Sequence, residues 1–346
     1  MSSTYEVVIS RTRLMQSELK DVTLPGKQAP RPIRIVGLAC PIANGRDISQ
    51  WLGVSLDSGS YFNFAPSVRP LTIEKSVQTF DQFTRYARLL SMAKPAFNHV
   101  KKHFACEAPD AQGVTKGSAI VFVGDRKQAR ITALDFVTYA TCGEDPQMFK
   151  NASLFGDEKA TLARFSEMST RRCLEQGIGI IHEGLSKMEV ALMKKLFKAG
   201  AIKLLVVTQG FSWELIGLQS NMVVLMDVER YDGSEGRMVE YPMADVLQME
   251  GLANRALETP DGQHLAPKCL LMCYTPRRDY FVKFLQEPLP VESDLAENLH
   301  DALNAEIVVG TIESKQDAVD WMTWTFLYRR LAPNPNYYNL SGRTAQ

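Results

Sequence analysis

The chain has 346 residues, and its 39 Lys plus Arg balance 39 Asp plus Glu to give a formal net charge of zero. This balance excludes a global field that would recruit nucleic acid or an acidic membrane, so any such binding must be local. The length exceeds what one hydrophobic core normally supports and predicts two domains, with a third partial one. Without a signal-peptide pattern or a run of about eighteen apolar residues, we expect a protein that is neither exported nor membrane-spanning.

The cysteines are scattered through apolar segments and lack the C-x-x-C and His-x-His spacings of zinc sites. They therefore predict reduced intracellular thiols and no metal site. Two of them, Cys269 and Cys273, would lie on one face of a strand and are interpreted as core packing. The six are Cys40, Cys106, Cys142, Cys173, Cys269 and Cys273.

Short, continuous, β-branched apolar runs recur along the chain and are typical of strands that are covered on both faces, as in a parallel sheet between helices. Helical patterns lie between most of them, which favours a doubly wound α/β domain. A further segment, 69–80, alternates like an edge or crossover strand. The six runs are 33–38, 119–124, 178–184, 203–208, 222–227 and 269–274.

The clearest predicted helix covers 186–200. Ser186 and Glu189 have the spacing of a capping box, and Gly200 supplies a left-handed stop. Other helices are predicted over 47–53, 294–307 and 316–331. Segment 287–293 reads as a proline-punctuated linker and 334–340 as a turn, while surface loops are predicted at 22–30, 108–117 and 259–267.

A phosphate-binding loop of the form GxxxxGK[ST] is absent from the sequence. The nearest run, GVTKGS at 113–118, has its lysine before the second glycine and is interpreted as a solvated turn. Asp227, at the end of the run 222–227, could be mistaken for a magnesium ligand. Without a phosphate loop before it, we interpret Asp227 as a cap of the strand and of the turn that follows.

Polar residues recur at the carboxyl ends of three predicted strands, where a parallel sheet presents its ligand-facing edge. Such side chains could contact a sugar-phosphate backbone without reading bases. Each alone is better explained as a solvated or locally satisfied group, but their recurrence on successive strands is stronger than any one of them. The nucleic-acid-binding candidates are Arg126, Lys127, His182, Thr208 and Gln209.

The stretch QMEGLANR, residues 248–255, is predicted to open a helix after a strand and a loop. A helix amino terminus with an arginine suits an anion, which makes Gln248, Gly251 and Arg255 candidates for a degenerate nucleotide site. An amphipathic helix with an incidental arginine is the alternative. No catalytic triad or paired-carboxylate spacing stands out.

Taken together, these segments resemble the superfamily-two RNA helicases of the DExH type, most closely the carboxyl-terminal cassette of the large helicases of the U5 small nuclear ribonucleoprotein. The resemblance covers nearly the whole chain, and its long carboxyl-terminal matches make accidental similarity untenable. The matching segments are 33–53, 88–95, 119–130, 180–208, 244–256, 284–312 and 316–340.

This resemblance implies an α/β fold with a RecA-like doubly wound parallel sheet. Residues 1–85 would be a remnant of the first RecA-like helicase lobe, residues 86–285 the second lobe, and residues 286–346 an incomplete winged-helix segment. The family unwinds small nuclear RNAs with ATP and magnesium during spliceosome activation, so the resemblance also implies a nuclear, spliceosomal location.

Departures from the family pattern bear on activity. The coupling motif Ser-Ala-Thr falls at Ala39-Cys40-Pro41, Glu214 and Ile216 replace a glycine and an asparagine, and Leu252 stands in place of the first arginine of QMEGLANR. A transition-state arginine is worth roughly a thousandfold in phosphoryl transfer, or about 4 kcal/mol. These departures predict a chain that hydrolyses no ATP and holds no cofactor of its own.

Three functions therefore stay open. The first is an inactive interaction module that binds the large U5 scaffold protein of the spliceosome and the active helicase cassette. The second is a fragment of an active ATP-dependent RNA helicase. The third is a passive RNA-binding module, which would use the polar residues at the strand ends.

Overall fold

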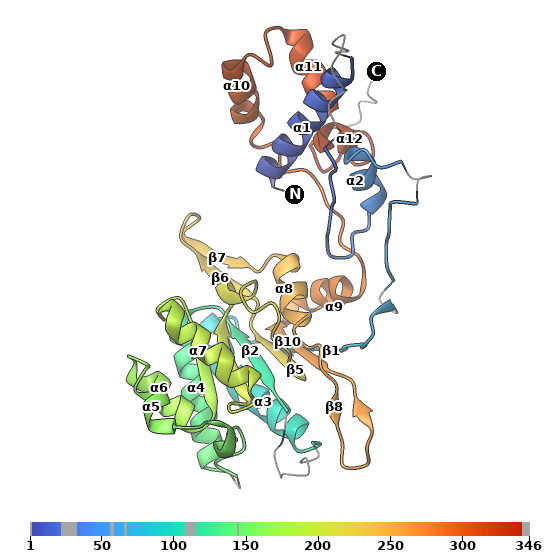
Figure 1. Cartoon of the computed structure of the whole chain (residues 1–346). Helices are drawn as coiled ribbons and strands as arrows, with labels where there is room; N and C mark the ends of the chain where they lie inside the picture. Colours follow the sequence, from blue (N-terminus) through green and yellow to red (C-terminus); the bar gives the residue numbers. More distant parts are fainter. Residues whose placement is uncertain are drawn as a thin grey trace, which may run out of the picture. The chain divides into compact units, whose positions relative to one another are not determined.

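A computed structural model describes residues 2–21, 33–55, 59–65, 68–107, 115, 117–143 and 145–340. The chain divides into two compact units, one of residues 66–286 and the other of residues 1–65 with 287–346 (Figure 1). The loop predicted at 22–30 and most of the loop predicted at 108–117 lie outside the described residues. No helix among the described residues is long and apolar enough to cross a membrane.

The larger unit is built on a six-stranded sheet in the order β1-β10-β5-β2-β4-β3, in which every neighbouring pair is parallel. Strand β1 forms one edge, as an edge strand was predicted there. The fold class predicted from the sequence, an α/β fold with a doubly wound parallel sheet, is therefore confirmed. The strands are β1 (Glu74–Phe80), β2 (Ala119–Val123), β3 (Ile178–Ile181), β4 (Leu204–Thr208), β5 (Met222–Met226) and β10 (Lys268–Tyr274).

Five of the six apolar runs form strands of this sheet, but the strand predicted at 33–38 is wrong. These residues form no strand, and the side chain of Leu38 is 95% exposed. An apolar run becomes a strand only when a neighbouring strand pairs with its backbone. Residues 33–38 belong to the smaller unit, where the nearest pairing among the described residues is an isolated bridge between Ile42 and Leu289.

Helices cover both faces of the sheet. On one face, α3 (Arg85–Phe104) and α4 (Arg126–Thr141) bury residues such as Phe97 and Phe136 against alternate strand residues. On the other face lies α7 (Lys187–Lys198), where a β-carbon at Gly179 would come within 2.7 Å of Met193 Sδ. The same β-carbon would lie 2.8 Å from Ile202 and from Leu205, so a larger residue at position 179 would force these packed side chains to shift.

The ends of α7 follow the sequence prediction. Ser186 accepts from the backbone N–H of Glu189, and the Glu189 carboxylate accepts from the backbone N–H of Ser186, which completes the capping box. Gly200 has a φ of +75°, a left-handed conformation that favours glycine and stops the helix.

The remaining elements of the larger unit lie outside the six-stranded sheet. A hairpin of β6 (Glu229–Asp232) and β7 (Arg237–Glu240) projects from the body of the unit (Figure 1). The loop predicted at 259–267 contains the turn of a small hairpin, β8 (Leu257–Glu258) and β9 (His264–Leu265). The helices are α5 (Glu158–Leu162), α6 (Met168–Glu175), α8 (Met243–Glu250) and α9 (Arg278–Gln286), with 3-10 turns at Ala152–Leu154, Gln209–Phe211 and Thr275–Arg277.

Strand β1 precedes residue 86, where the sequence placed a domain boundary, yet it pairs with β10 from Glu74↔Lys268 to Phe80↔Tyr274. The sheet of the larger unit therefore begins before that boundary. The division into helicase lobes remains a prediction, because compactness alone does not identify a lobe.

The smaller unit is helical. Helix α2 (Gly45–Trp51) fulfils the prediction at 47–53, and α10 (Leu299–Val309) lies largely within the one at 294–307. The helix predicted over 316–331 is divided at Trp324 and Thr325 into α11 (Lys315–Thr323) and α12 (Phe326–Leu331). The Thr325 side chain accepts from the backbone N–H of Tyr328, so it starts a new helix.

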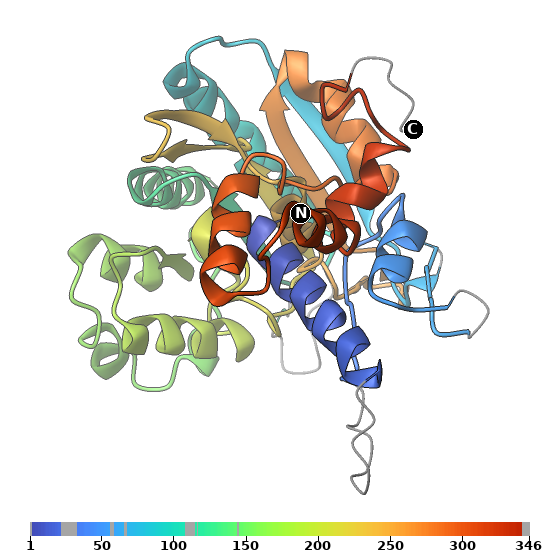
Figure 2. The ribbon, with the colours of Figure 1, turned by 90° about the horizontal axis from the view of Figure 1, so that it is seen from above.

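A long amino-terminal helix, α1 (Ser3–Asp21), was not predicted. It packs beside the carboxyl-terminal helices, where Val7 and Leu14 contact a core of Leu295, Ile312, Trp321 and Leu327 (Figure 2). Its buried Glu6 accepts hydrogen bonds from Ser293 Oγ at 2.6 Å and from Leu327 N at 2.7 Å. Burial raises the pKa of Glu6 although both hydrogen bonds oppose the change.

Candidate functional site

The carboxyl edge of the sheet presents two cations at the start of α4. Arg126 and Lys127 follow β2 and are both exposed. Asp125 caps this helix by accepting from the backbone N–H of Gln128 at 2.8 Å. Because the cap and the strand fix the backbone, the two side chains leave the sheet from a defined position.

Arg126 lies close to the loop after β3. A β-carbon built at Gly184 would approach its guanidinium to 2.5 Å, so only glycine leaves room for the arginine in this position. The structure thus brings together Arg126, which follows β2, and the end of β3 across the intervening β4, because the carboxyl ends of all these parallel strands lie at the same edge of the sheet.

His182, at the end of β3, is fully buried rather than presented to solvent. Its Nδ1 accepts from the backbone N–H of Gly184 at 3.1 Å, so its proton is on Nε2, which donates to Glu167 Oε2 at 3.1 Å. Burial opposes ionisation of Glu167, but the hydrogen bond from His182 and the nearby Arg130 lower its pKa below the ordinary value. Both nitrogens of His182 are therefore engaged within the protein, and the residue holds the loop that ends at Gly184.

Thr208 and Gln209 are also buried, at the end of β4. Thr208 Oγ1 donates to Glu183 Oε1 at 2.7 Å, and Gln209 Nε2 donates to Asp245 Oδ2 at 2.6 Å. The other oxygen of Asp245 accepts from the indole N–H of the half-exposed Trp213 at 2.8 Å. Of the five nucleic-acid candidates, only Arg126 and Lys127 face solvent.

Sequence reasoning missed an ionic cluster at the same edge. Asp227, after β5, is held by Arg88 from Nε and Nη2, both at 3.3 Å, and by Arg85 from Nε at 3.3 Å. Arg88 also reaches Glu229 Oε2 at 2.7 Å and Arg85 reaches Asp125 Oδ2 at 3.2 Å. The cluster joins α3, the strand ends and the cap of α4.

The burial of this cluster makes its charges interdependent. The side chains of Arg88 and Asp227 are 2% and 1% exposed. Burial alone would lower the pKa of Arg88, but the carboxylates of Asp227 and Glu229 outweigh it and raise that pKa. Asp227 has a φ of +66°, a left-handed conformation that aspartate tolerates better than most residues. Asp227 thus follows the strand, as predicted, but its carboxylate is held by two arginines, which no local sequence pattern places there.

The prediction that residues 248–255 open a helix is wrong. Helix α8 begins at Met243 after Pro242 and ends at Glu250, so Gln248 lies in its last turn and Gly251 just beyond it. An anion at this end would face carbonyl groups and the negative end of the helix dipole. The helix-terminus argument for Gln248, Gly251 and Arg255 as an anion site therefore fails.

The residues after α8 run along the segment before β5. The backbone N–H groups of Asn254 and Arg255 donate to Ser220 O, each at 3.1 Å, and Ser220 N donates to Leu252 O at 3.1 Å. Leu252 is buried at 3% exposure, in the position that holds an arginine in the resembled family. The segment is thus fixed to the sheet by its backbone and by an apolar side chain.

Arg255 itself is bound within the protein. Its Nη2 donates to Asn221 Oδ1 at 3.0 Å and to Ser118 Oγ at 3.4 Å. Ser118 precedes β2 and Asn221 precedes β5, so this contact lies at the amino edge of the sheet. Burial lowers the pKa of Arg255, although Glu107 opposes this effect.

The two groups of candidate residues therefore do not meet. Arg126 and Lys127 lie at the carboxyl edge of the sheet, and Arg255 lies at the amino edge. Among the described residues, no three His, Cys, Asp or Glu side chains form a group suited to a metal ion.

Comparisons with known proteins agree with the architecture. Residues 292–346 match the Winged Helix-turn-helix domain family. The chain is 44% identical over 340 residues to the U5 small nuclear ribonucleoprotein 200 kDa helicase of Homo sapiens, in an alignment that covers 97% of the chain and 14% of that protein. The chain belongs to the family of the U5 200 kDa helicases.

Two further relatives show how far this similarity extends. The U5 200 kDa helicase of Drosophila melanogaster is 41% identical over 339 residues, covering 98% of the chain and 14% of that protein. The DExH-box ATP-dependent RNA helicase DExH12 of Arabidopsis thaliana is 39% identical over 337 residues, in an alignment that covers 97% of the chain and 14% of that protein. The chain thus spans 14% of the length of each of these relatives.

Proposed function

We propose that the chain acts in the nucleus as an interaction and regulatory module of a spliceosomal DExH-type RNA helicase and hydrolyses no ATP itself. The names of the relatives, U5 small nuclear ribonucleoprotein helicases, support the spliceosomal setting. Its equivalence to the carboxyl-terminal cassette rests on the quoted sequence segments and is part of the same proposal.

The observation that carries the proposal is the burial of Leu252. A nucleotide-sensing arginine must extend its guanidinium toward the triphosphate, but this position is occupied by an apolar side chain packed against the protein. Replacing such a leucine with an exposed arginine would also leave a gap in the packing. The segment therefore stabilises the fold instead of contacting a nucleotide.

The second support comes from Arg255, the arginine that the stretch retains. Its guanidinium is engaged by Asn221 and Ser118, and Asn221 Nδ2 in turn donates to the carbonyl oxygens of Arg255 and Ala256 at 3.1 and 2.9 Å. To reach a γ-phosphate, Arg255 would have to leave these contacts and expose the buried Asn221. This cost favours a structural role for Arg255.

The proposal has two parts that are tested separately. The chain should hydrolyse no ATP, and it should bind the large U5 scaffold protein or the active helicase cassette. The purified chain is first titrated with a fluorescent ATP analogue and magnesium, and assayed for ATP hydrolysis with and without RNA. We expect no turnover. RNA-stimulated turnover by the pure chain would overturn the proposal and favour the alternative, an active helicase fragment.

The partner is tested separately with immobilised scaffold carboxyl-terminal domain and immobilised active cassette. Retention of the chain by either at micromolar concentration is expected. Absence of binding to both would contradict the interaction role even if the chain proved inactive toward ATP.

A second candidate function, passive RNA binding, is favoured by one observation: Arg126 and Lys127 are exposed side by side at the carboxyl edge of the sheet. The three buried nucleic-acid candidates would not touch RNA themselves. They would position the exposed pair, because His182 and Thr208 hold the adjoining loop and Gln209 holds α8.

A further inference from the structure

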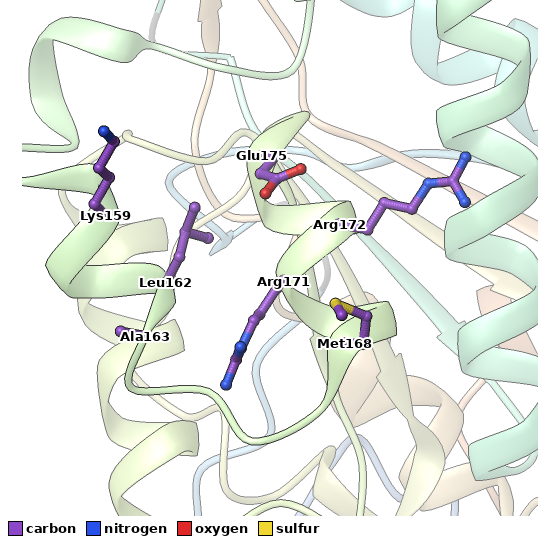
Figure 3. Close-up of a pocket in the computed structure, with 7 residues that line it drawn as sticks. All are labelled: Lys159, Leu162, Ala163, Met168, Arg171, Arg172 and Glu175. Atoms are coloured by element: carbon purple, nitrogen blue, oxygen red, sulfur yellow. The ribbon is translucent and has the colours of Figure 1, made fainter.

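An open hollow of about 540 Å³ lies between α5 and α6 (Figure 3). One wall comes from α5 and the residue after it, and the other from α6. Seven residues line it: Lys159, Leu162, Ala163, Met168, Arg171, Arg172 and Glu175.

The floor of this hollow is aliphatic. Figure 3 shows the side chain of Leu162 directed toward α6, where Met168 lies with 77% of its surface exposed. Leu162 and the exposed Met168 thus face the hollow from opposite walls, and a methionine adapts readily to an inserted apolar side chain. The lining contains no aromatic ring on which a base could stack.

The rim of the hollow is positively charged. Three cations, Lys159, Arg171 and Arg172, line it against a single carboxylate, Glu175. Among the residues that the structure describes, none of the three cations forms an ion pair, and the one fixed contact of Arg171 is from Nε to Phe165 O at 2.6 Å. That bond holds the guanidinium in place while its two Nη groups remain available, a geometry suited to a carboxylate.

We propose that the hollow between α5 and α6 docks an acidic segment of a partner protein, which inserts one apolar side chain between Leu162 and Met168 and places carboxylates against Lys159 and Arg171. A peptide fits better than RNA, because the floor suits an aliphatic side chain and offers no stacking surface. The inference deepens the proposed interaction role, and depends on it, by giving the chemistry of one contact.

The test uses fluorescence anisotropy of the full chain with a fluorescein-labelled peptide of alternating glutamate and leucine. Saturable binding is expected, with affinity about tenfold lower in the double variant Lys159→Glu with Arg171→Glu, because the two charges proposed to face the carboxylates become repulsive. Lys198→Glu, an exposed charge reversal on α7, is the matched control and should leave binding unchanged. Circular dichroism confirms that each variant is folded.

A second variant tests the apolar floor. Leu162→Asp should weaken binding of the same peptide. A peptide with lysine in place of glutamate should not bind the wild-type chain. Equal binding by wild type and double variant, or no saturable binding at all, would overturn the proposal. So would oligouridylate binding that is lost in the double variant, because the hollow would then be a nucleic-acid site.

These outcomes are distinguishable from failure of the proposed function. If the immobilised partners retain both wild type and the double variant, the interaction role stands and only the assignment of the hollow to those partners fails. If the acidic peptide binds while the chain also hydrolyses ATP, the docking role of the hollow stands and the proposal that the chain is inactive toward ATP fails.

Discussion

Arg255 donates from Nη2 to Asn221 Oδ1 at 3.0 Å, across the amino edge of the sheet. The contact ties the segment that follows α8 to the segment that enters β5. Arg255 therefore stabilises the fold at the amino edge of the sheet, whereas Arg126 and Lys127 lie at the carboxyl edge.

Arg255→Ala should lower the free energy of unfolding by about 1–3 kcal/mol, because Asn221 Oδ1 loses a charged donor in a buried setting. Urea denaturation measures the loss. Arg164→Ala, at an exposed arginine, is the control. A variant of unchanged stability with weaker nucleotide binding would show instead that Arg255 serves a nucleotide site.

Asp227→Asn should destabilise the larger unit by about 3–5 kcal/mol, because the buried Arg88 keeps its charge after losing its principal partner. Asparagine keeps the size of the side chain and tolerates the left-handed backbone, so the loss reports the charge. Thermal unfolding gives the measurement, with the exposed Asp261→Asn as control. Equal melting temperatures for the two variants would refute the role of the cluster.

Glu189→Ala should cost about 0.5–2 kcal/mol by removing the reciprocal cap of α7. Hydrogen bonds from Ser166 and Ser186 lower the pKa of Glu189 from 4.5 to about 2. Because its folded-state pKa is depressed, the stabilisation is present above pH 4.5 and is lost as the pH falls toward 2. The difference between wild type and variant should shrink over that range in urea titrations, whereas Glu258→Ala should show no such difference. A gap that is constant with pH would contradict this account.

Replacing Arg126 and Lys127 together by glutamate should weaken any RNA binding and reduce the dependence of log affinity on log salt by about 1.4–1.8, as two phosphate contacts are lost. Filter binding at several salt concentrations measures the slope. Lys195→Glu with Lys198→Glu on α7 is the matched control. Wild-type affinity that barely changes with salt would argue against phosphate contacts at this edge.

The parts of the fold that were predictable are those in which local pattern and tertiary environment agree. The buried strands and the cap of α7 are examples, since their residues need the same neighbours in any α/β sheet. Residues 33–38 have the same apolar character but no paired strand, so the identical pattern gave a wrong prediction. The sequence shows which residues are apolar enough to be buried, but it does not show whether a neighbouring strand is present to pair with them.

The candidate site was predicted less well, because its contacts join distant residues. The pair Arg88 and Asp227 is separated by 139 positions, and no local pattern indicates it. The start of α8 did have a local signal, since Pro242 immediately precedes Met243 and proline favours a helix start. The burial of His182 and Thr208 depends on Glu167 and Glu183, whose side chains turn inward only in the folded protein.

The pairing of β1 with β10 has a consequence for biosynthesis. Every described partner of Glu74–Phe80 in the ladder lies in Lys268–Tyr274, so on the ribosome the first strand emerges long before its neighbour. At roughly 5–20 residues per second, this strand waits for ten seconds or more with its backbone unpaired. We therefore expect that a silent codon change that slows translation between the two strands lowers the soluble yield without altering the finished protein.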